Sequence, residues 1–225
     1  MVFGGYVPQS GRRYVCTDFS TGGTGGQPNH DGVDALETDI ANTMNMPVES
    51  LELHYPIRVR RNALWSDSAG PGQWRGGLGV EREIEVLDGE ITLTLREDRH
   101  RTRSWGLYGG QPPEICRSEI VHKDGTIDHL PSKGIFQLSA GDAIHCWCPG
   151  GAGFGDPLSR DPTDVLEDVV DGKVSVASAE ADYGVVVDPD LLKIDTAATD
   201  LRRQELSAGR GPITWTYDRG ELGKS

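Results

Sequence analysis

The sequence predicts an α+β fold that is mainly antiparallel β in its centre, with short helices near the N-terminus and after residue 160. Three observations support this prediction. Apolar and charged residues alternate over residues 80–86, as in a half-exposed strand. Two Asp-Gly pairs, which favour tight turns between strands, follow strand-like segments. After residue 155, capping residues and glycine stops typical of helices replace the alternation.

The composition excludes several classes of protein. The 225 residues include 22 Lys and Arg against 35 Asp and Glu, a net charge of −13, which argues against a nucleic-acid or anionic-membrane partner. No run of about 18 apolar residues is present, so no membrane span is expected. The first residues lack the pattern of a secretory signal, and we therefore expect a cytoplasmic protein.

Residues 1–52 are predicted to form a glycine-rich loop and a short helix. Four glycines cluster in the loop, at Gly22, Gly23, Gly25 and Gly26. The cluster lacks the Lys-Ser/Thr pair of a phosphate-binding loop, so the simplest interpretation is a backbone that passes close to another segment. Residues 33–43 place apolar residues at helical spacing and predict the short helix. Pro47 then restarts the chain, in a helix first turn or an extended segment.

Residues 53–157 are predicted to form a β-rich core. The segments 80–86 and 91–95 both alternate between apolar and polar residues, and Asp88-Gly89 separates them. Because Asp-Gly is a preferred pair for tight turns, we expect these two strands to form a hairpin.

A second hairpin is expected around Asp124-Gly125, which lies between EIVHK and TIDHL. Two more strands are expected at 135–139 and 143–148, around the turn Ala140-Gly141-Asp142. In the segment HCWC, a strand would place Cys146 and Cys148 on one face and His145 on the other. That is poor geometry for a single metal ion, so these cysteines are interpreted as small buried side chains.

Residues 158–187 are predicted to be helical. Asp161-Pro162 opens a helix that runs to about Val170 and ends near Gly172. Ser175 can cap a second short helix that ends at Gly184. Residues 188–225 have little periodicity and are expected to form an irregular acidic and polar tail.

Six phrases, in this order, give the chain a resemblance to a known family. It resembles the C-terminal part of the hydantoinase B/5-oxoprolinase family over about residues 4–187. The family includes B-type subunits of ATP-dependent hydantoinases and lactamases, and related subunits of acetone and acetophenone carboxylases. The phrases are GGTGGQPNHDGVDALETDIANTMNMPVE (22–49), YPIRVRRNALWSDSAGPGQWRGGLGVEREIE (55–85), LREDRHRTRSWGLYGG (95–110), LPSKG (130–134), LSAGDAIHCWCPGGAGFGDPLSRDP (138–162) and VLEDVVDGKVSVASAEADYGVV (165–186).

The resemblance implies an ATP-dependent reaction shared between two types of chain. An A-type partner would bind ATP and Mg²⁺ and phosphorylate a lactam, hydantoin or enolate oxygen. The B-type chain would then hydrolyse the activated ring or complete a carboxylation. B-type chains are much longer than this one, and their metal ligands lie upstream of the part that is present here. A divalent zinc or manganese ion is therefore expected on a chain that carries the upstream half.

We therefore expect a hetero-oligomer that contains this chain, an A-type ATP-binding subunit and a chain carrying the upstream half. The chain would be a split gene product or a fragment, and inactive alone. It would complete the active-site cavity of a cyclic-amide hydrolase. Three alternatives stay open: a subunit of a ketone carboxylase, a purely structural subunit without ligand contacts, and a free-standing β-rich binding module.

Activated-phosphate chemistry needs cationic groups and backbone N–H donors near developing negative charge. Arg75-Gly76-Gly77 follows a turn-rich segment, and its guanidinium could bind a phosphate or carboxylate. The alternative is a structural arginine that ties loop carbonyls or a carboxylate. Arg99 lies in a charged strand end that is either an anion or interface site, or a self-compensated salt-bridge network. With the Gly22–Gly26 loop, Arg75 and Arg99 are the candidate contacts with a ligand.

His30-Asp31 is the weak candidate for metal ligation, because two adjacent residues cannot form a site without further ligands. No metal is therefore expected within this chain alone. The glycine run at 149–155 could offer N–H donors to an oxyanion, and its alternative is a tightly packed connection. The sequence contains no GxSxG motif and identifies no catalytic residue.

Overall fold

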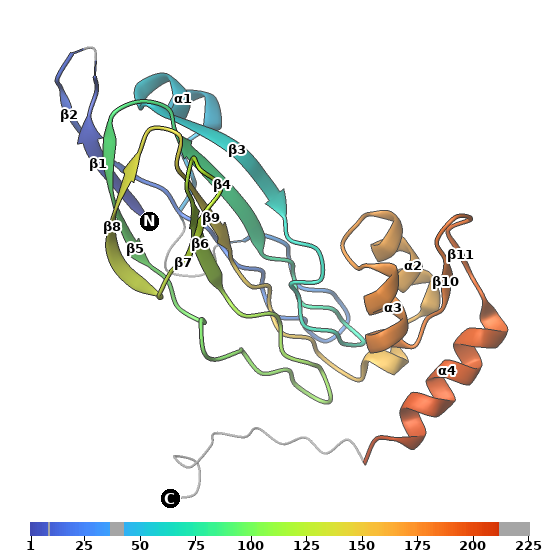
Figure 1. The fold of residues 1–225 in the computed structure, drawn as a ribbon. Coiled ribbons are helices and arrows are strands. Elements are labelled where there is room, and N and C mark those ends of the chain that lie inside the picture. Colours follow the sequence, from blue (N-terminus) through green and yellow to red (C-terminus); the bar gives the residue numbers. More distant parts are fainter. Residues whose placement is uncertain (9, 37–42, 212–225) are drawn as a thin grey trace, which may run out of the picture.

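The computed structural model describes residues 1–8, 10–36 and 43–211, and two antiparallel sheets form its larger part (Figure 1). The first sheet has the order β2-β1-β5-β8, with β1 at Val2–Tyr6, β2 at Arg13–Thr17, β5 at Glu90–Arg96 and β8 at Lys133–Ser139. The second has the order β3-β4-β9-β6-β7, with β3 at Ile57–Leu64, β4 at Val80–Val86, β9 at Ala143–Trp147, β6 at Arg117–Val121 and β7 at Ile127–His129. The predicted α+β class, with an antiparallel centre, is confirmed.

The apolar residues of the alternating segments form the core between the sheets. Ile84 and Val86 of β4 are buried, and so are Ile91 and Leu93 of β5. All four belong to one cluster with Phe3 and other apolar side chains of both sheets. Each such side chain stabilises the fold by roughly 1.5–3 kcal/mol when it leaves water.

The predicted hairpin around Asp88-Gly89 is wrong, although both of its strands exist. β4 pairs with β3 and β9, whereas β5 pairs with β1 and β8. The turn, with Gly89 at φ +73°, therefore carries the chain from one sheet to the other. Two strands that face each other across a sandwich bury alternate residues just as two paired strands do, so the alternation cannot separate these arrangements.

The expected strands around Ala140-Gly141-Asp142 also exist and also belong to different sheets, as β8 and β9. The hairpin around Asp124-Gly125 is confirmed, because β6 and β7 pair with each other and Gly125 has φ +87°.

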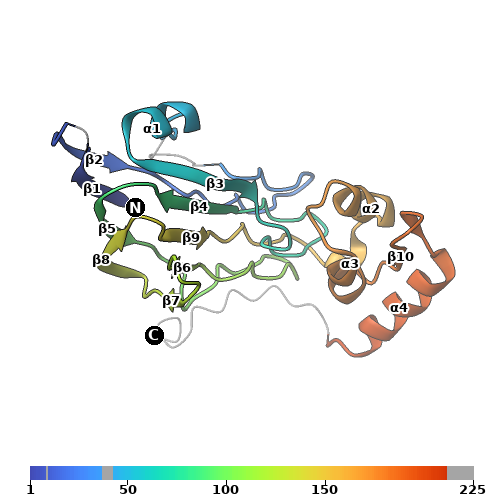
Figure 2. The same cartoon turned by 45° about the horizontal axis from the view of Figure 1, so that its top comes forward.

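Extended glycine-rich segments form a second kind of packing beyond the strands (Figures 1 and 2). Residues 22–33, 68–79 and 149–155 are joined by backbone hydrogen bonds, such as Gly77 N–H to Thr24 O at 2.8 Å and Gly151 N–H to Gly77 O at 2.8 Å. A Cβ atom on Gly23, Gly76 or Gly151 would overlap a backbone carbonyl oxygen of a neighbouring segment. The close backbone approach expected of the glycines is confirmed, and we call these segments the glycine bundle.

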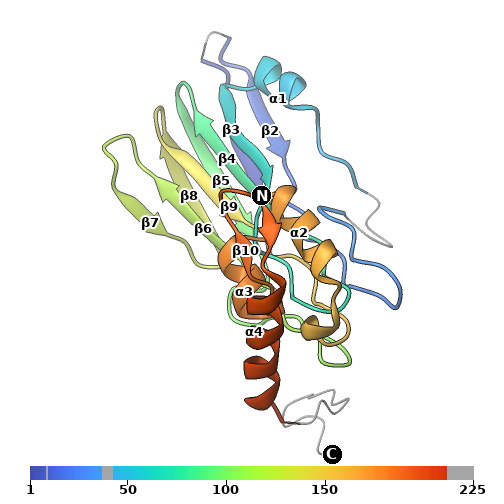
Figure 3. The same cartoon turned by 90° about the vertical axis from the view of Figure 1, so that its right-hand side faces the viewer.

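The helices after residue 160 gather at one end of the molecule, and Figure 3 shows them in front of the strands. A short 3₁₀ helix at Pro157–Ser159 leads into α2 at Pro162–Val170 and α3 at Val176–Tyr183. Asp161 accepts a hydrogen bond from Thr163 N–H at 2.8 Å, and Ser175 Oγ accepts one from Ser178 N–H at 3.1 Å. These caps confirm both predicted helices.

The expectation of an irregular tail is wrong for residues up to 208. Short strands β10 (Val187–Asp188) and β11 (Lys193–Ile194) pair, and helix α4 spans Thr196–Ala208. Among the α4 residues only Thr199 is buried, so the helix lacks the apolar stripe that would have predicted it. Residues 212–225 lie outside the described residues.

The N-terminal part differs from the prediction in two places. β1 and β2 pair within what was expected to be loop. Residues 33–36 form a turn with Ala35 at φ +48°, where a helix was expected; most of that segment, 37–42, lies outside the described residues. The turn is held because Asp34 Oδ1 accepts a hydrogen bond from Leu78 N–H at 2.7 Å.

The helix of the N-terminal part begins later, after Pro47, as α1 at Val48–His54. The division of the chain into four parts at 52, 157 and 187 stays a prediction. Across the described ranges, no helix is both long and apolar enough to cross a bilayer.

Candidate functional site

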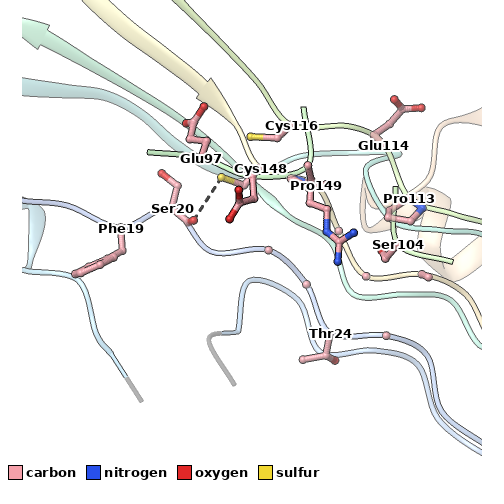
Figure 4. Close-up of a pocket in the computed structure, with 18 of the residues that line it drawn as sticks. Phe19, Ser20, Thr24, Glu97, Ser104, Pro113, Glu114, Cys116, Cys148 and Pro149 are labelled. Atoms are coloured by element: carbon pink, nitrogen blue, oxygen red, sulfur yellow. Dashed lines mark hydrogen bonds between the residues drawn. The ribbon is translucent and has the colours of Figure 1, made fainter. Parts of the chain in front are cut away.

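A cavity of about 830 Å³ lies between the glycine bundle and the strand ends of the two sheets (Figure 4). Residues 19–25 and 149–152 of the glycine-rich segments form part of its lining. Residues 96–99, just after β5, and residues 113–116, just before β6, form other parts. The cavity therefore combines exposed backbone with charged and thiol side chains.

The structure brings several of the predicted site residues together at this cavity. Gly22, Gly23, Gly25 and Arg99 all line it. Gly26 donates its N–H to Ala152 O at 2.9 Å, and Gly76 and Gly77 are buried within the glycine bundle. The glycines therefore have a packing role, and those at the cavity add a wall made of backbone.

Three cysteines meet at one side of the cavity. The side chains of Cys116 and Cys148 line it, and Cys146 is fully buried on β9. Cys148 Sγ donates to Ser20 O at 3.4 Å, as drawn in Figure 4. The adjacent Cys148 thiol and then burial raise the pKa of Cys116 far above its usual value, and burial raises that of Cys146. The thiols of these two residues are therefore neutral near pH 7, and neither is a ready nucleophile.

Glu97, His100 and Ser118 form a polar cluster beside these cysteines. His100 Nε2 lies 2.8 Å from Glu97 Oε2, and Ser118 Oγ donates to the Glu97 carboxylate at 2.8 Å. Sequence reasoning did not single out this cluster. The spacing of Glu97 and His100 was readable, but Cys116 and Ser118 come from another strand, and only the sheet topology brings them close.

Arg75 lies away from this cavity, in a buried ion-pair network at the helical end. Its side chain is 4% exposed, and its Nε lies 3.3 Å from Asp168 Oδ1. Its Nη1 donates to Asp34 Oδ1 at 3.3 Å and to Gly76 O at 2.5 Å. Arg160 completes the network with Asp31 and Asp168. The geometry favours the structural alternative for Arg75, a cation that ties a loop carbonyl and carboxylates together.

The weak metal candidate, His30-Asp31, lies in the same region. His30 is exposed, and its Nδ1 lies 2.9 Å from the backbone oxygen of Asp31. The Asp31 carboxylate accepts hydrogen bonds from Arg160 and from Arg75 N–H. Burial alone would raise the pKa of Asp31, but the bonds and charge of Arg160 outweigh it and hold the pKa below its usual value. A cation at Asp31 would have to displace this arginine.

The sequence phrases and this architecture agree with one family. The family described as hydantoinase B/oxoprolinase matches residues 1–157. The chain belongs to the hydantoinase B/oxoprolinase family.

Three similar proteins place the chain within the family. A Pseudomonas sp. (strain NS671) protein, named as the B-type subunit of a D-/L-hydantoinase, is 37% identical over 200 residues, which is 87% of this chain and 33% of that protein. The crystal structure of ATP-dependent caprolactamase from Pseudomonas jessenii is 28% identical with a TM-score of 0.81, over 90% of this chain and 36% of the other. Nucleotide-free acetone carboxylase is 25% identical with a TM-score of 0.81, over 94% of this chain and 34% of the other.

These relatives include both a lactam hydrolase and a ketone carboxylase, and the fold is equally close to both. This member of the hydantoinase B/oxoprolinase family spans about a third of the length of the proteins it matches.

Proposed function

We propose that the chain is a subunit of an ATP-dependent cyclic-amide hydrolase of the hydantoinase, oxoprolinase or lactamase type. The observation that carries this proposal is the glycine-walled cavity with Arg99 on its lining, in a chain of this family. An 830 Å³ cavity is large enough for a small ring, and a guanidinium suits a phosphorylated or carboxylate intermediate. The chain completes the cavity and supports the assembly.

The complete enzyme is a cytoplasmic hetero-oligomer in this proposal. An A-type partner chain binds ATP and Mg²⁺ and activates the ring, and a chain with the upstream half of the B-type subunit holds a divalent zinc or manganese ion. This division of labour is supported by the share of the relatives' length that the chain covers and by the name of the hydantoinase relative. The chain alone is then inactive, and no nucleic acid or membrane takes part.

Within this chain, Arg99 and the backbone of the Gly22–Gly25 loop are the proposed ligand contacts. Arg75, Gly76, Gly77 and Gly26 support the cavity through packing. No catalytic residue is assigned to this chain.

A ketone carboxylase is the second candidate, because acetone carboxylase has the same TM-score as the caprolactamase. A purely structural subunit is the third candidate, because most of the glycines and Arg75 serve packing.

The test is to purify the chain from its native source with the proteins that co-elute and to measure ATP hydrolysis. Cyclic amides and small ketones are added separately, each with and without bicarbonate. Ring opening that needs ATP but no bicarbonate supports the hydrolase, and ATP use that needs bicarbonate and a ketone supports the carboxylase. A monodisperse, folded chain that turns over a substrate without any partner contradicts both.

A further inference from the structure

We propose that Glu97, His100 and Cys116 form a binding site for a divalent metal ion at the side of the cavity. One imidazole nitrogen, one carboxylate oxygen and the Cys116 sulfur lie within 4.8 Å of one another. This site differs from His30-Asp31, and it goes beyond the proposed reaction because metal binding here does not depend on which substrate the complex uses.

The folding of the chain explains why these three side chains meet. Glu97 follows β5, and Cys116 precedes β6, so strands of both sheets deliver them. Arg99, at φ +65°, turns the backbone so that His100 returns to Glu97, with Nε2 2.8 Å from Oε2. Cys116 N–H donates to Arg99 O at 3.0 Å, which fixes the cysteine beside the same turn.

The positions of the ligand atoms suit a small metal ion. Zinc binds thiolate sulfur at about 2.3 Å and imidazole nitrogen at about 2.0–2.1 Å, so ligand atoms around zinc lie closer together than 4.8 Å. Rotations of the three side chains that bring the farther atoms together would therefore form the site. His100 Nε2 would leave Glu97 and bind the ion, and the Cys116 thiol would lose its proton to solvent as the metal–sulfur bond forms.

The surroundings of the three side chains are those of a supported site. The side chains of Glu97 and His100 are 10% and 14% exposed, and Cys116 is buried. Ser118 Oγ donates to Glu97 and would hold the carboxylate in place, as hydrogen bonds behind metal ligands commonly do. Glu97 and Cys116 line the cavity, which gives the ion and a fourth ligand a path to the site (Figure 4).

The set of donors indicates the type of metal. A thiolate with an imidazole and a carboxylate favours zinc over magnesium or calcium, which prefer oxygen ligands. Three protein ligands leave one position of a tetrahedral zinc ion open toward the cavity.

The test uses the full chain in the assembly in which it is purified, loaded with Co²⁺ as a spectroscopic substitute for zinc. We expect one Co²⁺ per chain with a thiolate-to-cobalt charge-transfer band and the visible bands of tetrahedral cobalt. Cys116→Ser should remove the charge-transfer band. His100→Gln should weaken Co²⁺ affinity at least about tenfold, the lower end of what even an outer-shell change costs.

Two matched controls should leave the spectrum unchanged. Cys16→Ser alters a buried cysteine on β2, and His129→Gln alters an exposed histidine on β7. His100→Gln and Glu97→Gln keep the thiols intact and serve if Cys116→Ser does not fold.

The metal site is rejected if the native chain shows no thiolate-bound cobalt. It is also rejected if the band survives in Cys116→Ser, or if His100→Gln and Glu97→Gln both bind Co²⁺ as tightly as the native chain. The readout is separate from turnover. An active complex without thiolate-bound cobalt rejects the metal site alone, and bound cobalt in a complex without any ATP-dependent activity rejects the proposed function alone.

Discussion

Arg160 binds Asp31 through two hydrogen bonds of 2.7 Å each, although 129 residues separate them in the chain. Arg160 is also 2.8 Å from Asp168 of α2, whose other partner is Arg75. The network therefore joins the glycine bundle, through Asp31 and Arg75, to the helical end. Breaking one partner of such a network leaves a buried charge with fewer bonds, and this predicts a measurable loss of stability.

Asp31→Asn should lower the free energy of unfolding by about 2 kcal/mol, within the range for hydrogen bonds to charged groups. The reason is that Arg160, whose side chain is 4% exposed, loses its doubly bonded ion pair. Urea unfolding of the purified chain measures the change. The control is Asp171→Asn, since Asp171 is 58% exposed and pairs only at the surface with Lys173. It should change stability by less than about 0.5 kcal/mol.

The effect of Asp31→Asn should also depend on pH. The folded-state pKa of Asp31 lies below its usual value, so its contribution is fully present above the unfolded pKa of about 3.9. It is lost as the pH falls through the folded-state pKa. The native chain and the variant should therefore converge in stability in acid, and a difference that persists below that pKa would contradict an ionic origin.

Gly76→Ala should destabilise the chain by about 3 kcal/mol or more, the upper part of the range for overpacking. Its Cβ atom would overlap Gly151 O, and backbone cannot move aside as a flexible side chain can. The control is Gly4→Ala, because the nearest neighbour of a Cβ atom at Gly4 would be Tyr14 O, at 3.9 Å. Thermal unfolding should show a large loss for the first variant and little change for the second. Equal losses would mean that the bundle tolerates side chains.

Sequence patterns predicted the elements better than their partners. The alternation at 80–86 and 91–95 located β4 and β5, and local caps located α2 and α3. The pairing of the strands could not be predicted, because alternation records which face is buried and not which strand lies alongside. α4 was missed because its residues are polar on nearly every side.

The candidate site was predicted in part for a similar reason. The glycine cluster and Arg99 were identifiable, since glycine clusters and arginine have local signatures. The group of Glu97, His100 and Cys116 was not, because it forms only where β5 and β6 of different sheets end close together. Arg75 was a ligand candidate because its burial partner Asp168 lies far along the chain, with nothing local to mark the pair.

Arg99→Gln should lower kcat/KM of the assembled complex about tenfold, equivalent to about 1.4 kcal/mol, if its guanidinium contacts an anionic group in the cavity. The substitution keeps a long polar side chain at a position with positive φ, so the backbone strain stays the same. The control is Arg101→Gln, a nearby exposed arginine. Equal turnover by the native, Arg99→Gln and Arg101→Gln complexes would favour a purely structural subunit.

The hairpin of β6 and β7 carries a histidine that should respond to pH. His122 Nε2 lies 3.0 Å from Asp128 Oδ2, and Nδ1 lies 3.3 Å from Asp142 Oδ1. The hydrogen bond with Asp128 is the main cause that raises the pKa of His122 above its usual value. Its stabilisation is fully present below the unfolded pKa of about 6.5 and is lost as the pH rises through the folded-state pKa.

Asp128→Asn should therefore lower the pKa of His122, which an NMR titration of its ring protons measures directly. Asp88→Asn, an exposed turn residue between β4 and β5, should leave that pKa unchanged. Amide exchange in β7 should become faster above the His122 pKa in the native chain, and this pH dependence should weaken in Asp128→Asn. If His122 titrates at or below a pKa of about 6.5 in the native chain, the two carboxylates do not hold the imidazolium, and the hairpin relies on its backbone pairing alone.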